Sequence, residues 1–228
     1  MNSTLVFGGT FDPVHKGHIE SACAVARRLG DVDVYLVPCQ IPAHRPTPAA
    51  SPEARLEMLQ LAVASQDRIF VDDCELRREG TSYTIDTLLG YRERVGESGR
   101  LLFLMGRDSW GTLPIWYRWE ELTDLAHLLI LERPGTDQRS PEVLRKWLQT
   151  RQVKDPEEMM ASASGKVCFL SLDQIDVSAS ELREAIAKGS SIERNVNPLV
   201  MNYIRQHNLY TSAPSGNKLH GKRWSTNE

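Results

Sequence analysis

Two histidines and a pair of glycines near the N-terminus carry the clearest chemical signal in this sequence. Gly8 and Gly9 follow the short apolar stretch of residues 4–7, which is typical of a buried parallel strand. A glycine pair here lets the backbone turn with positive φ and come close to a ligand. His15 and His18 are three residues apart, so on the first turn of a helix both project from one side and can donate to phosphate oxygens. The stretch predicts a phosphate-binding loop.

The helix that follows this loop cannot hold a polyphosphate by its dipole alone. Apolar residues at 17–29 recur at helical spacing, so the N–H groups at the helix start are expected to face the loop. A helix N-terminus stabilises a neighbouring anion by only about 0.3–1 kcal/mol. Other donors must therefore converge on the same place, and this is the function expected of the histidines.

Two simpler interpretations of the histidines stay open from their spacing alone. Each could cap the helix or lie at the surface, and H-x-x-H could supply two zinc ligands. The cysteines do not support zinc, because they occur singly, without paired-ligand spacing, at Cys23, Cys39, Cys74 and Cys168. We predict no metal ligands in the protein itself.

Apolar strands alternate with amphipathic helices along most of the chain. Strands are predicted at 4–7, 32–38, 69–76, 100–105, 126–131 and 166–170, and helices at 17–29, 51–65, 85–95, from about 177, and at 198–206. This alternation predicts an α/β fold, a doubly wound parallel sheet with helices on both faces, in a single domain of residues 1–210. Ligands bind such sheets at the carboxyl ends of the strands. Residues 136–165 are predicted to be a polar surface excursion without chemistry, and residues 211–228 a disordered tail.

The bulk composition restricts the class of protein. The chain has 228 residues, of which 41% are hydrophobic and 25% charged, as in a globular protein with a substantial core. A net charge of −3 argues against a broad nucleic-acid surface. There is no apolar run of membrane-spanning length and no basic leader, so we expect no membrane partner and a cytoplasmic location. Whether the chain forms a homo-oligomer stays open.

Other polar groups follow the later strands, and each has an ordinary structural alternative. Asp108 could cap a helix, bind ribose hydroxyls or hold a magnesium-bound water. Ser82 and Thr84 flank a helix start that could be an ordinary hydroxyl cap or a carboxylate receptor. Trp116 could pack in a lid or stack on a pyridinium ring. Arg133 could pair with a phosphate or with Asp108.

Two further segments offer charge to an anion. His44 and Arg45 lie in a proline-rich segment that could be a solvated linker. Arg55 on the next helix could reach back to the site or lie on a solvated helix face. Ser178 stands three residues before Glu181, which is the spacing of a capping box. The same serine, with Ser180 and Arg183, could instead clamp phosphate.

The string G-G-T-F-D-P-V-H-x-G-H resembles the signature of the HxGH nucleotidyltransferase superfamily, and in this full form that of bacterial nicotinate-nucleotide adenylyltransferases. Further matches extend to about residue 210. The resemblance implies a Rossmann-like fold, with His15 and His18 as the catalytic pair that binds the ATP phosphates. It implies ATP contacts from Gly8, Gly9, Thr10, Phe11, Gly106, Asp108, Ser178, Ser180 and Arg183. It implies contacts with nicotinate mononucleotide from His44, Arg45, Ser82, Tyr83, Thr84, Trp116, Tyr117 and Arg133.

The sequence departs from the family pattern at three positions. Cys39 stands where asparagine is expected, Arg107 where glutamine is frequent, and Ala179 where a hydroxyl residue is usual. The resemblance gives Arg107 no role.

The implied reaction transfers the adenylyl group of ATP, with Mg²⁺, to nicotinate mononucleotide in NAD biosynthesis. The products are nicotinate adenine dinucleotide and pyrophosphate. Two alternatives stay open: an adenylyltransferase for another acceptor, such as nicotinamide mononucleotide or phosphopantetheine, and a non-catalytic nucleotide- or RNA-binding module.

Overall fold

The centre of the molecule is one parallel β-sheet. The computed structural model describes residues 3–30, 32–43, 46–132, 140–172 and 177–211. Within them seven strands form a sheet of order β4-β2-β1-β6-β7-β9-β8, and every neighbouring pair is parallel. The strands are β1 (Ser3–Gly9), β2 (Val32–Pro38), β4 (Ile69–Val71), β6 (Arg100–Gly106), β7 (His127–Glu132), β8 (Gln152–Val153) and β9 (Val167–Ser171).

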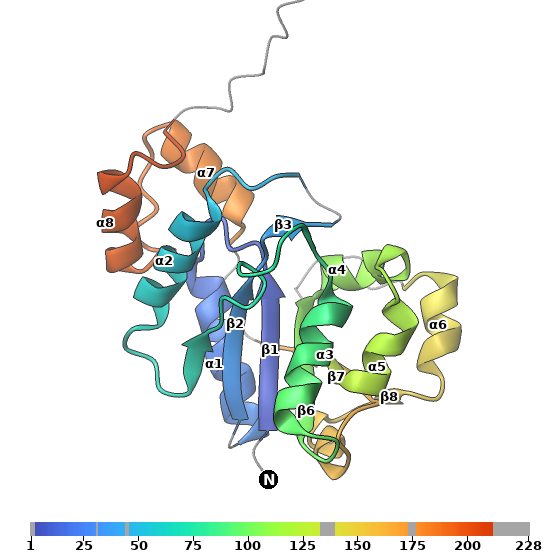
Figure 1. Cartoon of the computed structure of the whole chain (residues 1–228). Helices are drawn as coiled ribbons and strands as arrows, with labels where there is room; N and C mark the ends of the chain where they lie inside the picture. Colours follow the sequence, from blue (N-terminus) through green and yellow to red (C-terminus); the bar gives the residue numbers. More distant parts are fainter. Residues whose placement is uncertain (1–2, 31, 44–45, 133–139, 173–176, 212–228) are drawn as a thin grey trace, which may run out of the picture.

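Helices cover both faces of this sheet (Figure 1). On one side lie α1 (Lys16–Leu29), α2 (Pro52–Val63), α7 (Ala179–Ala187) and α8 (Pro198–Gln206). On the other lie α3 (Thr84–Val95), α4 (Arg107–Thr112), α5 (Leu122–Leu125) and α6 (Glu142–Leu148). There are also three short 3₁₀ helices in the described residues, η1 (Leu113–Ile115), η2 (Trp119–Glu121) and η3 (Pro156–Ala161). The predicted fold class is confirmed.

Successive side chains of β1 divide between the two cores. Leu5 and Phe7 pack with the α1 side, whereas Val6 packs with the α3 side. The strand order reverses at β1, which has β2 and β6 as neighbours. In open α/β sheets this switch point opens a crevice at the carboxyl ends of the strands, and the loop after β1 therefore lies where a ligand is expected.

The predicted strand at 69–76 is wrong in length, because β4 ends at Val71. The Asp72 carboxylate ends it: Oδ1 accepts a hydrogen bond from the Cys74 amide at 2.9 Å, which turns the chain. Oδ2 accepts from the Tyr91 hydroxyl at 2.8 Å and fixes this turn to α3. A further two-stranded sheet, β3 (Ile41–Pro42) with β5 (Thr81–Ser82), is too short to give a sequence pattern.

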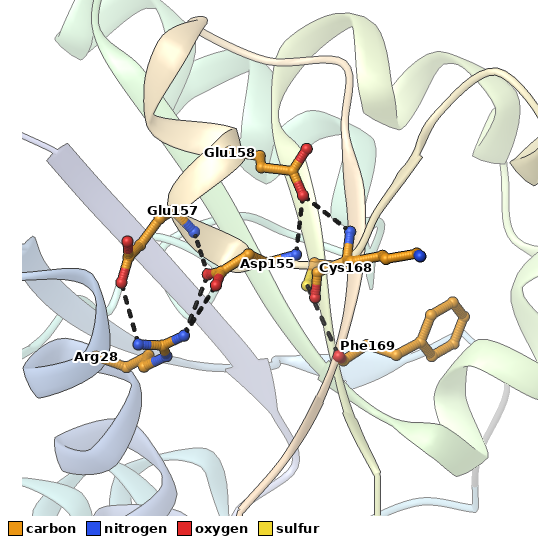
Figure 2. Close-up of polar contacts among 7 residues, drawn as sticks. Arg28, Asp155, Glu157, Glu158, Cys168 and Phe169 are labelled. Carbon is orange, nitrogen blue, oxygen red and sulfur yellow. Dashed lines mark hydrogen bonds and ion pairs between the residues drawn. The ribbon is translucent and has the colours of Figure 1, made fainter.

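The segment predicted to be a surface excursion is part of the fold. It supplies the edge strand β8, and Met159 of η3 is fully buried. Figure 2 shows how η3 is fastened to α1: Arg28 donates to Asp155 at 3.1 and 3.2 Å and to Glu157 at 3.0 Å. After Thr211, the predicted tail lies outside the described residues. No described helix is both long and apolar enough to cross a bilayer.

A buried histidine at the start of β7 makes the fold sensitive to acid. Nδ1 of His127 accepts from the Lys166 amide at 3.1 Å, so Nε2 carries the proton and donates to the Ser162 carbonyl at 3.0 Å. Burial is the main cause of the lowered pKa of this imidazole, with Arg92 and Lys166 adding to it. A protonated ring would direct a second N–H at the Lys166 N–H.

His127 should therefore destabilise the protein as pH falls. The unfolded chain binds this proton near pH 6.5 and the folded protein only at lower pH, so stability is retained above about 6.5 and lost below it. Between about pH 7.5 and about pH 5.5, the thermal midpoint should fall more in the wild type than in His127→Gln. His207→Gln, at an exposed histidine, is the control and should behave as wild type. Parallel losses in all three proteins would contradict this role.

Candidate active site

A cleft of about 1230 Å³ opens at the carboxyl edge of β1 and β6. It is larger than the usual 300–1,000 Å³ of a small-molecule site. Every described residue that was predicted for either substrate lines it: Gly8, Gly9, Thr10, Phe11, His15, His18, Ser82, Tyr83, Thr84, Gly106, Asp108, Trp116, Tyr117, Ser178, Ser180 and Arg183. The predicted residues His44, Arg45 and Arg133 lie outside the described residues.

The glycine pair works differently from the prediction. Gly8 and Gly9 end β1, paired with Val37 and Pro38, and neither has a positive φ. Glycine is needed at position 9 because a Cβ there would lie 2.9 Å from the Phe11 ring. The loop turns at Phe11 itself, whose φ of 49° is unusual for an aromatic residue. Strain of this kind is held where the surrounding structure fixes it, and here Phe11 is 2% exposed.

The two histidines form one unit at the start of α1. Their rings stack with centroids 3.7 Å apart, and the His15 amide donates to Nδ1 of His18 at 3.3 Å. The edges of Phe7 and Phe11 contact the His18 ring, with centroids at 6.1 and 5.0 Å. Both imidazoles are therefore held in fixed orientations on one side of the helix start, as their spacing predicts.

Not every N–H group at the start of α1 is available to a ligand, whereas the sequence predicts that these groups face the loop. His15 is the N-cap of α1, and the Lys16 amide donates to the Asn195 carbonyl at 2.9 Å. Gly17 lies between the histidines because a Cβ there would be 3.0 Å from Val177 and 3.1 Å from Nδ1 of His15. A larger residue would displace either the histidine or the segment that leads into α7.

The start of α7 brings hydroxyls and a guanidinium to the same cleft. Ser178 is the N-cap, and its Oγ accepts from the Glu181 amide at 3.2 Å, so the capping role is present. Arg183 donates to the Asp12 carbonyl at 2.6 Å and to Ser180 Oγ at 3.3 Å. Its guanidinium is only half-buried and lines the cleft, within the reach of a bound phosphate.

Asp12 is a buried junction that the sequence analysis did not assign. Its carboxylate accepts from the amides of Ala49 at 2.7 Å and Ala50 at 3.1 Å, and from the Tyr210 hydroxyl at 2.7 Å. Arg183 lies 3.8 Å from the same carboxylate. Ala49 and Ala50 end the segment of residues 39–50 that carries the predicted His44 and Arg45, and we call this segment the acceptor loop. Asp12 thus fixes the end of the acceptor loop to the phosphate-binding loop of residues 8–15, which we call the phosphate loop, and its bond to Tyr210 holds that residue against the body of the protein.

The side of the cleft that the sequence predicts for the acceptor is built from three segments. Tyr83 is the N-cap of α3 without a side-chain cap bond, so of the two alternatives left open for this helix start the hydroxyl cap is not formed. Ser82 Oγ instead accepts from the Gln40 amide at 2.9 Å, which joins this segment to the acceptor loop. The rings of Tyr83 and Tyr117 lie 5.0 Å apart, and Trp116 is held by its Nε1 bond to Thr112 at 3.3 Å.

A buried carboxylate supports this side. Glu75 is 6% exposed and accepts from the Thr87 hydroxyl at 2.5 Å. Burial raises the pKa of Glu75, and the hydroxyls of Thr87 and Ser82 oppose the shift. No sequence motif marks Glu75. Its hydrogen bond to Thr87 holds the turn that carries Glu75 against α3.

Two residues after β6 have different environments. Asp108 is exposed and faces the cleft, and as the second residue of α4 it is not the cap, which is Gly106. Arg107 points into the protein, where its guanidinium lies 4.9 Å from the centre of the Phe169 ring. Arg107, which stands where glutamine is frequent in the family pattern, therefore packs behind the site.

Comparison with known proteins agrees with this geometry. Residues 6–185 match the family model described as cytidylyltransferase-like, which places the chain among the nucleotidyltransferases. A protein named "Probable nicotinate-nucleotide adenylyltransferase" of Marinomonas sp. (strain MWYL1) is 40% identical over 90% of this chain and 93% of its own length. One from Pseudomonas aeruginosa is 41% identical over 90% of this chain and 95% of its own. The chain therefore belongs to the nicotinate-nucleotide adenylyltransferase family.

Solved structures share the fold. The Plasmodium falciparum nicotinic acid mononucleotide adenylyltransferase complexed with NaAD superimposes with a TM-score of 0.71 at 19% identity, over 93% of this chain and 99% of the other. The same Plasmodium enzyme complexed with APC gives 0.68 at 20% identity, over 93% and 98%.

Replacement of Asp12 by asparagine tests the buried junction. An amide oxygen cannot accept all three hydrogen bonds, and its NH₂ would face one of the donors. We expect Asp12→Asn to lower the free energy of unfolding by about 1.5–3 kcal/mol, measured by urea denaturation. Asp33→Asn removes a surface pair with Arg68 and should cost less than about 1 kcal/mol. Equal losses would show that the Asp12 contacts have no special weight.

Proposed function

We propose that this protein transfers the adenylyl group of ATP to nicotinate mononucleotide, forming nicotinate adenine dinucleotide and pyrophosphate in NAD biosynthesis. The observation that carries the proposal is the stacked pair His15 and His18 in the same cleft as the Tyr83–Tyr117 wall. One set of groups suits phosphates and the other suits an aromatic acceptor. The names of the relatives at about 40% identity support this assignment.

The reaction needs positioning and charge neutralisation rather than a nucleophilic side chain. A phosphate oxygen of nicotinate mononucleotide attacks the α-phosphorus of ATP, a P–O bond forms, and the bond to the pyrophosphate oxygen breaks. His15, His18 and Arg183 donate hydrogen bonds to the phosphate oxygens as negative charge moves to the leaving group. Donors fixed in place before the reaction cost no reorganisation in the transition state. The stacking of the histidines and the anchoring of Arg183 to Asp12 supply this fixation.

The acceptor ring is assigned to the wall formed by Trp116, Tyr117 and Tyr83. A pyridinium over an aromatic face is favourable, and Trp116 is held for stacking by Thr112. The first turn of α3, which starts at Thr84 without a side-chain cap, offers backbone N–H groups to the carboxylate. Such donors would face the NH₂ of the corresponding amide, so the acid is preferred.

Magnesium is proposed to enter with ATP. Among the residues described, there is no cluster of three His, Cys, Asp or Glu side chains that could cage an ion. Mg²⁺ in nucleotide sites usually needs only one or two carboxylates besides phosphate and water. Asp108, exposed in the cleft, fits this requirement, and the ion would offset phosphate charge when bound.

We also propose a cytoplasmic location and small-molecule partners. The four cysteines are free thiols in the structure, as a reducing compartment would keep them. A net charge of −3 provides no general attraction for nucleic acid, so anionic substrates are attracted by the local donors of the cleft.

Pyrophosphate release tests the reaction and its acceptor together. The purified protein is assayed with ATP and Mg²⁺, and with nicotinate mononucleotide or nicotinamide mononucleotide at equal concentration. We expect the acid to react at least about 10²-fold faster in kcat/KM. Equal rates would show that there is no carboxylate receptor at Thr84. No pyrophosphate release with either acceptor would overturn the proposed function.

His18→Ala tests the phosphate role of the histidine pair. Loss of one pre-positioned donor should lower kcat by about 10²–10³-fold. The thermal midpoint of the variant is measured beside the rate, because His18 also receives the His15 amide bond. A folded variant with near-wild-type kcat would refute the role.

A further inference from the structure

A buried guanidinium lies directly behind the wall of the cleft. Arg55 is in the first turns of α2 and is completely buried. Its Nη1 donates to the Thr10 carbonyl at 2.9 Å, and its Nη2 donates to the Cys39 carbonyl at 2.7 Å and more weakly to Gln40 at 3.4 Å. Arg55 does not line the cleft, so it acts through these carbonyls and not by touching a substrate.

Among the described residues, the partners of the Arg55 charge are carbonyl oxygens and not a carboxylate. No carboxylate in the part of the chain that the structure describes lies within ion-pair distance of Arg55, and its Nε has no hydrogen-bond partner. A buried cation without a counter-ion is costly, and an apolar residue of similar size is often as good for stability alone. The presence of Arg55 at this place is therefore better explained by the segments that its contacts position than by stability.

The contacts join the two loops that carry the substrates. Thr10 belongs to the phosphate loop, whereas Cys39 and Gln40 begin the acceptor loop. The Gln40 amide continues the connection to Ser82 at 2.9 Å, on the acceptor side of the cleft. Asp12 binds the other end of the acceptor loop, so this loop is fastened to the phosphate loop at both ends.

We infer that Arg55 is a positioning residue for adenylyl transfer, whose forked guanidinium sets the spacing between the phosphate loop and the acceptor loop. The inference rests on the proposed function, because it assigns the two loops to ATP and to the acceptor. The planar fork presents donors in fixed directions to two segments at once, which a lysine ammonium on a flexible stem does not do. An error of about 1 Å in the approach of the two substrates can cost about 10²-fold in rate.

The chain contains a matched control at the opposite end of the sheet. Arg92 of α3 also binds carbonyls only: Leu125, Gly96 at 2.8 Å, Gly99 at 2.6 Å and Ala163 at 3.0 Å. Gly99 and Leu125 precede β6 and β7, away from the carboxyl edge. Arg92→Met should therefore reduce thermal stability without affecting catalysis.

The experiment compares Arg55→Lys, Arg55→Met and Arg92→Met with the wild type. For each protein we measure the thermal midpoint, kcat, both KM values and the Kd of a non-hydrolysable ATP analogue by calorimetry. Arg55→Lys keeps the charge and should lower kcat at least about 10-fold while the Kd changes less than about threefold. Arg55→Met should lower kcat by about 10²-fold and also raise the Kd of the ATP analogue, because the Thr10 carbonyl loses its hydrogen-bond donor. Arg92→Met should keep kcat and Kd within about twofold at a comparable loss of thermal midpoint.

Two results would overturn the inference. One is a wild-type kcat in Arg55→Lys, which would show that the fork is not needed. The other is a fall of kcat in Arg92→Met that parallels its loss of stability. This result would show that loss of stability alone lowers kcat, with no special positioning role for Arg55. If the wild type itself releases no pyrophosphate, the proposed function fails, and an unchanged Kd in Arg55→Met then refutes the placement of the phosphate loop by Arg55.

Discussion

Two phosphate groups that repel each other must be brought to reacting distance, and this requires that the loops after two adjacent strands keep one position relative to each other. The parallel pairing of β1 and β2 sets the first part of that position, since it runs in register to Gly9 and Pro38, and the Cys39 amide then donates to the Gly9 carbonyl at 3.0 Å. Beyond the strands, Arg55 and Asp12 take over. Arg55 supplies donors to carbonyls and Asp12 accepts from amides, so backbone groups that the loops leave unpaired are satisfied by side chains.

The same contacts explain why the donors in the cleft are ready before a substrate arrives. Asp12 fixes Arg183 through its carbonyl and Tyr210 through its carboxylate, so three distant parts of the chain meet at one buried residue. The histidines are aligned by their mutual stacking and by the edges of Phe7 and Phe11. In such a site, ordering the side chains in the transition state costs little free energy, because folding has already ordered them.

The sequence predicted the fold class and the membership of the cleft because both depend on local patterns. Alternating strands and helices specify a parallel sheet, and the histidine and serine motifs lie at its carboxyl edge for that reason. Side-chain contacts between distant segments leave no such pattern. Asp12 lies inside the recognised motif but its partners lie at residues 49–50, 183 and 210, and Glu75 has no motif at all. The glycine pair was assigned the wrong geometry because glycine serves either a positive φ or a close approach, and only the packed Phe11 ring decides between them.

The central claim is a single in-line displacement by positioned substrates, without a covalent enzyme intermediate, and its stereochemical course tests it most directly. The protein is supplied with one diastereomer of adenosine 5′-(α-thiotriphosphate) and nicotinate mononucleotide, and the configuration at phosphorus in the thio-dinucleotide product is determined. A single displacement inverts the configuration, which is the result that this account predicts. Retention would require two successive displacements through an adenylylated side chain and would contradict it.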